Sequence, residues 1–195
     1  MKLYIYLFRH GQTTYNRDKR FTGFNDAKLT KLGINQAKII AKKLKNKKFS
    51  VAFYTGLIRS TQTLKEVLRY HSHIKLIKDN RMIERNYGRL NGHTHKEIIK
   101  KYGQEQFEKW HRGFNCRPPG GESFADVERR VNKFITWLKK FMKKNKVNVV
   151  ISSHGNSIRL FRKILEHKSE KEAVRWFIPY DKIFSYSLDI GASHK

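Results

Sequence analysis

Two short apolar segments of this chain each end in a histidine that is followed by a glycine. Residues 3–8 lead into Arg9-His10-Gly11, and residues 147–151 lead into Ser153-His154-Gly155. Continuous apolar runs of this length are typical of strands that are covered on both faces. Ligands of open α/β sheets bind outside the carboxyl ends of the strands. The pair of segments therefore predicts one site, built from two loops at one edge of a sheet.

The rest of the chain alternates between strand and helix patterns. Further strands are predicted over residues 51–54, 74–77 and 183–188, the last at a sheet edge. Helices are predicted over residues 30–45, 57–70, 95–102 and 104–114, from Ser123 onward, and over 156–165. Ser123-Phe124-Ala125-Asp126 has the form of a capping box. This order predicts an α/β fold with three layers, α/β/α, around a mainly parallel central sheet. We expect a single domain over residues 1–195, with an insertion at about 88–121 that covers the site.

Composition indicates a folded chain with a strong preference for anions. Hydrophobic residues make up 38% of the 195, and no apolar run approaches the roughly 20 residues of a membrane span. The single cysteine, Cys116, excludes an internal disulfide, and the expected location is the cytoplasm. Lys and Arg outnumber Asp and Glu by 43 to 16, a formal net charge of +27. We interpret the lysine clusters at residues 42–48 and 139–146 chiefly as solvated surface, and otherwise as a field that steers a phosphorylated substrate.

The groups expected at the sheet edge suit phosphoryl transfer. A neutral imidazole can attack phosphorus, so His10 is the candidate nucleophile. The transferring group spreads negative charge over three oxygens, and the expected donors to them are helix N-terminal amides together with Arg9, Arg59 and His154. The positive neighbours should lower the pKa of His10. Glu84, which follows the third strand, is the candidate acid that protonates the leaving oxygen.

Each of these residues also has a structural interpretation. A histidine after a strand is often structural, the arginines could be ordinary surface cations, and Glu84 could simply pair with Arg85. All five groups nevertheless fall at strand ends of one predicted sheet. This coincidence favours a shared catalytic site.

Motifs along nearly the whole chain, from Leu3 to about Leu188, resemble a known family. Arg9-His10-Gly11-Gln12-Thr13 with Asn16 is similar to the RHG signature of the histidine phosphatase superfamily. Within it, the chain looks most like the cofactor-dependent phosphoglycerate mutases. Further matching motifs are Arg20-Phe21-Thr22-Gly23-Phe24-Asn25-Asp26, Leu29-Thr30-Lys31-Leu32-Gly33, Glu84-Arg85-Asn86-Tyr87-Gly88, Tyr102-Gly103-Gln104-Glu105-Gln106 with Trp110, and His154-Gly155-Asn156-Ser157 with Arg159.

The resemblance implies a role for each matching residue. His10 would carry the phosphoryl group and Glu84 would act as acid and base. The phosphate pocket would consist of Arg9, Arg59, His154, Asn16 and Asn156. Substrate would also contact the backbone of Thr22 and Gly23 and the side chains of Tyr87, His95 and Arg112. Such mutases need no metal and no tightly bound cofactor, but they are primed with 2,3-bisphosphoglycerate.

The chain departs from the mutase pattern at two cationic positions. His95, with Lys96 beside it, stands where a lysine is usual, and His111 replaces the first of two arginines and leaves Arg112. A long loop of larger mutases is also absent between Pro119 and Gly120, as it is in shorter mutases. Because histidine titrates at about pH 6.5, we expect His95 and His111 to gain charge below neutrality and to hold the far end of the substrate.

Three functions are consistent with these observations. The first is a phosphoglycerate mutase that interconverts 3- and 2-phosphoglycerate, and the second is a phosphomonoesterase in which water accepts the phosphoryl group from His10. The third is a non-catalytic phosphate- or RNA-binding protein. Nucleic acid is not the expected partner, because the aromatic residues lie in predicted core stripes rather than among the lysines.

The expected partner is a small phosphorylated metabolite. A membrane is not expected as a partner, and self-association stays open. The His-x-His pairs at residues 71–73 and 93–95 have no nearby cysteine or carboxylate in the sequence, so no metal is expected there.

Overall fold

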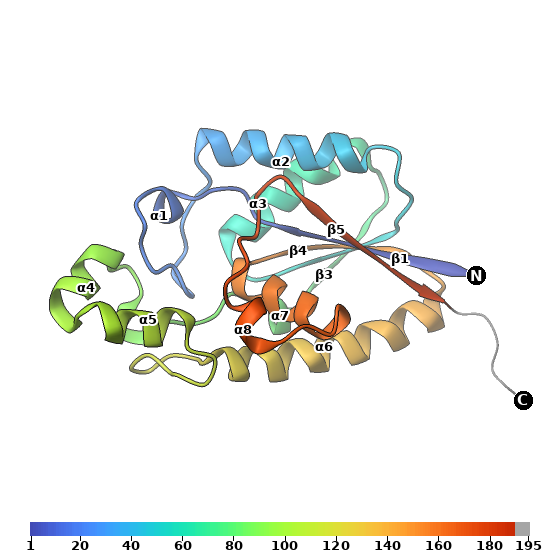
Figure 1. Ribbon diagram of the computed structural model, residues 1–195. Coiled ribbons are helices and arrows are strands. Elements are labelled where there is room, and N and C mark those ends of the chain that lie inside the picture. The colour runs from blue at the N-terminus through green and yellow to red at the C-terminus, as the bar shows by residue number, and fades with distance from the viewer. Residues whose placement is uncertain (190–195) are drawn as a thin grey trace, which may run out of the picture.

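A central five-stranded sheet organises the molecule, and the computed structural model describes residues 1–189 of the chain (Figure 1). The strand order is β3-β2-β4-β1-β5, with β1 Lys2–Arg9, β2 Val51–Tyr54, β3 Lys75–Lys78, β4 Val149–Ser153 and β5 Ile183–Asp189. Strands β1 to β4 run parallel, and β5 pairs antiparallel with β1 at the edge. The predicted mainly parallel sheet and its last edge strand are confirmed.

Helices cover both faces of the sheet and complete the three predicted layers. Helices α2 Lys31–Leu44 and α3 Ile58–Val67 lie on one face, and α6 Phe124–Asn145 and α7 Gly155–Leu165 lie on the other (Figure 1). The shorter helices are α1 Thr14–Arg17, α4 His95–Tyr102, α5 Gln104–Arg112 and α8 Glu170–Ala173, and the 3-10 turns are η1 Leu68–Tyr70, η2 Asn80–Met82 and η3 Gly88–Leu90. The capping box predicted at Ser123 is present, because Ser123 and Asp126 each accept the other's backbone N–H with their side chains.

Side chains of the central strands alternate between two cores. Leu7, Phe53 and Ile151 pack toward α6 and α7, whereas Phe8 and Val150 pack toward α2 and α3. Both faces of these strands are therefore buried, which explains why their sequences are apolar without interruption.

The parallel strands end at one edge of the sheet, on the left of Figure 1, where α4 and α5 also lie. The loop after β1 packs closely on the start of α2 at this edge. A Cβ on Gly11 would lie 2.2 Å from the Gly33 carbonyl oxygen, and a Cβ on Gly33 would lie 2.1 Å from the Gln12 carbonyl oxygen. The glycine that follows His10 is thus required by the close approach of two backbones.

Arg85 ties the segment between η3 and α6 to this edge. Its side chain is fully buried, and its guanidinium donates to the carbonyls of Glu122 (2.6 Å), Trp110 (2.9 Å) and Cys116 (3.1 Å). Glu84 accepts the backbone N–H of Arg85 at 2.9 Å instead of pairing with its side chain. The simple Glu84–Arg85 ion pair is therefore not formed, because the guanidinium is committed to backbone carbonyls.

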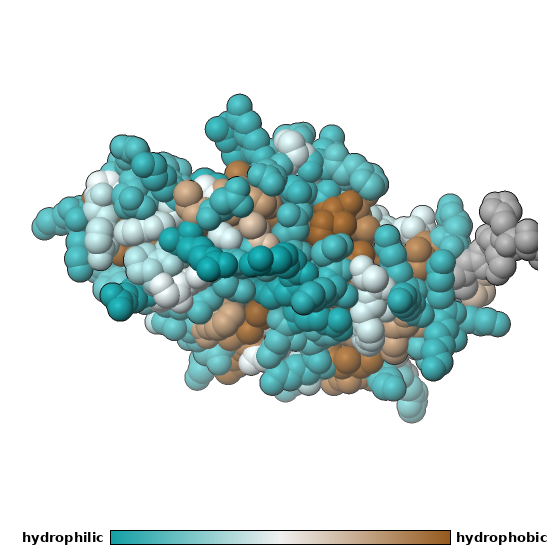
Figure 2. Space-filling view, turned by 90° about the horizontal axis from the view of Figure 1, so that it is seen from below, coloured by the Kyte–Doolittle hydropathy of each residue, from teal (hydrophilic) through white to brown (hydrophobic). Residues whose placement is uncertain are grey.

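The face of the molecule seen from below is largely hydrophilic. Seen from below, the molecule is mostly covered by polar side chains, and apolar ones gather in separate patches (Figure 2). Within residues 1–189, no helix combines the length and the apolar character that crossing a membrane requires.

Replacing Arg85 with methionine should destabilise the protein strongly. The change leaves three part-buried carbonyl oxygens without their donor, and the loss of a buried partner costs about 1–3 kcal/mol. We expect the free energy of unfolding to fall by about 3 kcal/mol or more, measured by urea denaturation. Arg69→Met is the matched control, because Arg69 is 46% exposed and lies 3.9 Å from its nearest carboxylate, Glu66. The control should lose less than about 1 kcal/mol, and an equal loss in both variants would contradict the anchoring role.

Candidate active site

The pairing of β1 with β4 brings the two strand-end histidines together. The register aligns Arg9 with Ser153, and the His10 N–H donates to the Ser153 carbonyl at 2.9 Å. The buried rings of His10 and His154 have centroids 5.0 Å apart. One nitrogen of each ring and one carboxylate oxygen of Glu84 lie within 4.8 Å of one another. Groups from three separate loops thus meet at one point.

A single hydrogen bond orients His10 as a nucleophile. Its Nδ1 lies 2.7 Å from the Gly11 carbonyl oxygen, which can only accept, so Nδ1 carries the ring hydrogen. The lone pair of the neutral ring is then on Nε2. Burial lowers the pKa of His10 well below its usual range, and the positive charges of Arg59 and Arg9 lower it further. The expected neutral imidazole is confirmed, with burial as the main cause.

A hydrogen bond with Thr55 holds one ring nitrogen of His154. The Thr55 hydroxyl oxygen lies 2.7 Å from His154 Nε2, while the opposite nitrogen, Nδ1, is buried and has no hydrogen-bond partner. Burial, together with Arg59 and His10, lowers the pKa of His154 well below its usual range. One nitrogen of His154 is therefore anchored and the other is available to a ligand.

Two arginines each keep a buried Nε–H without a partner. Arg59 donates through Nη2 to Gly23 at 2.8 Å and through Nη1 to the Asn25 carbonyl at 2.9 Å, and Arg9 donates through Nη1 to Ile178 at 3.0 Å. The Nε atoms of both arginines are buried without a partner. Burial lowers the pKa of Arg59 to about 10, so the side chain stays charged at neutral pH. Unpaired buried donors are costly, and these two, with positive charge behind them, suit an anion.

Glu84 is placed by hydrogen bonds from three elements. Ser153 and Ser157 donate to the carbonyls of the two residues that precede Glu84. Its Oε1 accepts the backbone N–H groups of Arg85 and Asn156, at 2.9 and 3.1 Å. The N-terminal amide of α7 at Asn156, where the sequence indicated a donor to phosphate, thus serves Glu84 instead. Oε2 is left as the oxygen that can exchange a proton.

A pocket of about 240 Å³ opens at these groups and collects the predicted substrate contacts. Its lining includes nine of the twelve site residues predicted from the sequence: Arg9, Asn16, Thr22, Gly23, Glu84, Tyr87, His95, Arg112 and Asn156. The other three, His10, Arg59 and His154, are at most 1% exposed. The structure therefore brings all twelve to one region.

The pocket wall also contains residues that sequence reasoning did not assign to the site, namely Lys19, Arg20, Arg159, Phe177 and Tyr180. Arg159 lies three residues after Asn156 on α7 and donates to its Oδ1 at 2.6 Å, a helical spacing that could have signalled it. The Asn156 amide nitrogen donates to the Tyr87 hydroxyl at 3.1 Å. Tyr180, whose ring centroid is 4.1 Å from the Arg9 guanidinium carbon, comes from a loop with no local pattern to predict it.

His95 and His111 are neutral in this pocket. Their rings pack against Phe21 and Phe107, with centroids 4.7 Å apart for His95 and Phe21 and 5.0 Å apart for His111 and Phe107. Burial lowers the pKa of His111 to about 2, and Arg112 contributes to the shift; burial and Arg112 also lower the pKa of His95. The expectation that both gain charge near neutrality is wrong, because burial and the positive charge of Arg112 disfavour the imidazolium.

The charge of the site decides between a cation and an anion as its ligand. His10, Glu84 and His154 are close enough to share a metal ion. The guanidinium groups of Arg9 and Arg59, which act on both histidines, oppose a cation there and attract a phosphate. The arrangement therefore suits phosphoryl transfer to His10.

Known proteins resemble this chain over nearly its whole length. The model of the histidine phosphatase superfamily (branch 1) matches residues 5–190. A 2,3-bisphosphoglycerate-dependent phosphoglycerate mutase from Mesorhizobium japonicum is 36% identical over 175 residues, which cover 88% of this chain and 85% of the relative.

Solved structures share the fold. An alpha-ribazole phosphatase from Shigella flexneri has a TM-score of 0.82 at 22% identity, covering 97% of this chain and 91% of that one. A phosphoglycerate mutase from Bacillus anthracis has a TM-score of 0.81 at 20% identity, covering 96% and 88%. With the family match and the geometry of its site, the chain belongs to the histidine phosphatase superfamily.

Proposed function

We propose that this protein is a phosphoglycerate mutase that interconverts 3- and 2-phosphoglycerate through a phosphohistidine at His10. The observation that carries the proposal is the charge of the pocket. Beyond Arg9, its wall holds Arg20, Arg112 and Arg159, more positive charge than one phosphate needs. A phosphoglycerate presents a phosphate and a carboxylate, and its size fits a pocket of about 240 Å³. The mutase-named relative at 36% identity supports the same substrate.

In the proposed reaction, Nε2 of His10 already carries a phosphoryl group when the monophosphoglycerate enters. The free hydroxyl of the substrate attacks this phosphorus, its proton passes to the Glu84 carboxylate and the bond to Nε2 breaks, which gives a bisphosphoglycerate. Nε2 then attacks the other phosphorus, the bond from that phosphorus to the substrate oxygen breaks, and the leaving oxygen takes the proton back from Oε2 of Glu84. The free Nε groups of Arg9 and Arg59 and Nδ1 of His154 bond the non-bridging oxygens.

Turnover in this scheme requires that His10 is phosphorylated first. We propose that 2,3-bisphosphoglycerate supplies the first phosphoryl group and that no metal takes part. The substrate pair would place the enzyme in glycolysis and gluconeogenesis, in the cytoplasm, with a small phosphorylated metabolite as its partner.

A phosphomonoesterase is the second candidate. It is favoured by the neutral His95 and His111, which stand where the mutases that the chain resembles carry cations. A pocket with less positive charge holds the second anionic group of a phosphoglycerate less firmly. In this case water accepts the phosphoryl group from His10, with Glu84 taking its proton.

The two candidates differ in their response to the primer. As a mutase, the purified protein should convert 3- to 2-phosphoglycerate, and 2,3-bisphosphoglycerate should accelerate the conversion. His10→Ala should lose both turnover and the acid-labile label left by a phosphorylated substrate. Hydrolysis of phosphoglycerate in place of isomerisation would select the phosphatase. Acid-labile label that persists in His10→Ala would exclude a phosphohistidine at His10 for both candidate functions.

Loss of the Glu84 carboxyl should depend on the leaving group. In Glu84→Gln, transfer from a poor leaving group should slow by roughly 10²–10⁴-fold, the usual contribution of general acid catalysis. An aryl phosphate such as p-nitrophenyl phosphate needs little protonation and should slow much less. Steady-state kcat/KM for an alkyl and an aryl phosphate compares the two effects. Equal losses for both substrates would show that Glu84 is not the proton donor.

The Thr55 hydroxyl should control which nitrogen of His154 carries the hydrogen. If the hydroxyl donates to Nε2, the neutral ring keeps its hydrogen on Nδ1, where it can bond the phosphate. Thr55→Val keeps the shape but removes the bond, and kcat/KM should fall by about tenfold, the equivalent of about 1.4 kcal/mol. Thr55→Ser, which keeps the hydroxyl, should retain most of the rate. Similar rates in Thr55→Val and wild type would exclude this role.

A further inference from the structure

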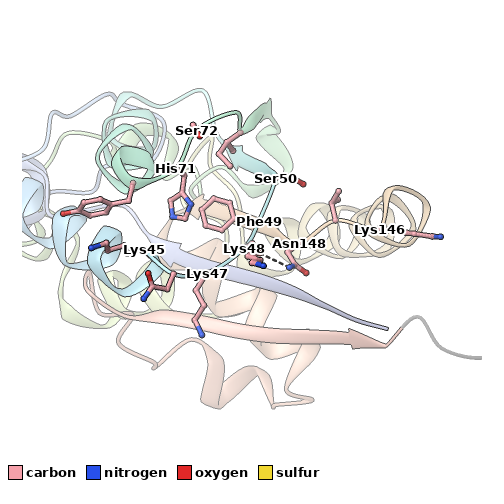
Figure 3. A pocket seen from close by; sticks show the side chains of 13 residues that line it. Lys45, Lys47, Lys48, Phe49, Ser50, His71, Ser72, Lys146 and Asn148 are labelled. Atoms are coloured by element: carbon pink, nitrogen blue, oxygen red, sulfur yellow. Dashed lines mark hydrogen bonds between the residues drawn. The ribbon is translucent and has the colours of Figure 1, made fainter.

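A recess beside the strands lies at the amino end of the parallel sheet, opposite the catalytic edge. It is formed by residues 45–50 before β2, residues 70–72 and 74 before β3 and residues 146–148 before β4. Its volume is about 610 Å³. We call this surface the amino-end recess. Figure 3 shows its side chains: Lys45, Lys47 and Lys48 lie near Phe49 and His71, and Lys146 lies farther away at the end of α6.

The amino-end recess is strongly basic. Lys45, Lys47, Lys48 and Lys146 line it, and its lining contains no acidic residue. All four lysines are exposed. Among residues 1–189, the lysines that form ion pairs with carboxylates are Lys109, Lys163 and Lys168, so the charges of the recess are uncompensated. Such a group of free ammonium groups attracts phosphates.

Exposed aromatic rings border these lysines on both sides. Tyr70 is 44% exposed, and its ring centroid lies 5.6 Å from the Lys45 ammonium. A second, smaller pocket contains Tyr4, which is 38% exposed, and shares Asn46, Lys47, Lys48 and Asn148 with the recess. The two pockets are therefore one continuous surface, with a tyrosine toward each end and lysines between them.

We propose that this surface binds single-stranded nucleic acid with little sequence preference. Lysines that contact phosphates and aromatic rings that stack on bases are the two elements of such sites. The sequence argument against nucleic acid relied on aromatics being confined to core stripes, whereas the fold brings Tyr4 and Tyr70 to the surface beside lysines that are distant in sequence. His71 adds a buried Nε2 without a partner, which can hydrogen-bond a base.

The shape of the recess favours a flexible strand over other polyanions. A bilayer surface is flat and cannot fill a recess of about 610 Å³. A splayed nucleotide can enter such a recess while its phosphates remain at the lysines on the rim. Because the catalytic pocket is at the other end of the sheet, both sites can be occupied at once.

Binding can be measured by fluorescence anisotropy with labelled oligouridylate of about 20 nucleotides, at about 50 to 200 mM salt. The test variant is Lys45→Gln/Lys47→Gln/Lys48→Gln. The matched control, Lys100→Gln/Lys101→Gln/Lys171→Gln, removes the same charge from exposed positions, two on α4 and one on α8. We expect the test variant to bind at least about tenfold more weakly, with a salt slope lower by about 2. The control should change affinity by less than about twofold.

The stacking of a base on Tyr70 and the location of the bound strand are tested separately. Tyr70→Leu should weaken binding by about tenfold, as expected for one lost base–ring stack. His10→Ala should leave the affinity unchanged, since His10 lies in the catalytic pocket at the other end of the sheet. A matched oligodeoxythymidylate shows whether RNA or DNA is preferred.

Several results would overturn the proposal. Equal weakening of the two lysine triples would indicate general surface charge, and no effect of Tyr70→Leu would exclude stacking. Weaker binding in His10→Ala, with the affinity of the test triple unchanged, would locate the strand in the catalytic pocket. Binding to phosphatidylserine vesicles that is lost in the test triple, without binding to either oligonucleotide, would assign the surface to membranes instead.

Discussion

The parallel register of β1 against β4 is the constraint on which the catalytic edge depends. Because Arg9 is level with Ser153, the next residues, His10 and His154, leave the sheet side by side. Side chains alternate between the faces of a strand, so a slip of one residue would direct the two histidines to opposite sides. The close contact between Gly11 and Gly33 fixes the loop after β1 against the start of α2, one residue beyond His10. Strand pairing and backbone packing thereby set the position of the nucleophile.

Burial gives this site its electrostatic character. Buried guanidinium groups are satisfied by backbone carbonyls rather than by carboxylates, as at Arg59 and Arg85. Their charge is therefore not cancelled locally. Glu84 is the one carboxylate in the pocket lining of the described chain, so the site presents positive charge and unpaired donors to a ligand. Such preorganised donors stabilise a transferring phosphoryl group without rearrangement. The same desolvation keeps His10 neutral, and it removes the charge that His95 and His111 were expected to supply.

The two ends of the sheet have different chemistry for a topological reason. In a parallel sheet with returning helices, strands end where helices begin, and helices end where the next strands begin. Catalytic groups follow β1, β2 and β4 at one edge, while the lysine-rich ends of α2 and α6 gather at the other (Figure 1). Much of the net charge of +27 thus lies away from the substrate pocket. This separation allows a polyanion and a small phosphorylated metabolite to use different surfaces.

Local patterns in the sequence determined the layers, the strands and the groups available for chemistry. Apolar runs and a capping box define elements through short-range rules, and a histidine or glutamate after a strand must lie near the carboxyl edge. Tertiary structure alone decided the remaining features: the anchoring of Arg85, the bond from Thr55 to His154, the entry of Tyr180 into the pocket and the burial that neutralises His111. Each depends on residues far apart in sequence, and no periodicity records which distant group will exclude water from a side chain. For the same reason, only the fold shows that Tyr4 and Tyr70 lie on one lysine-rich surface.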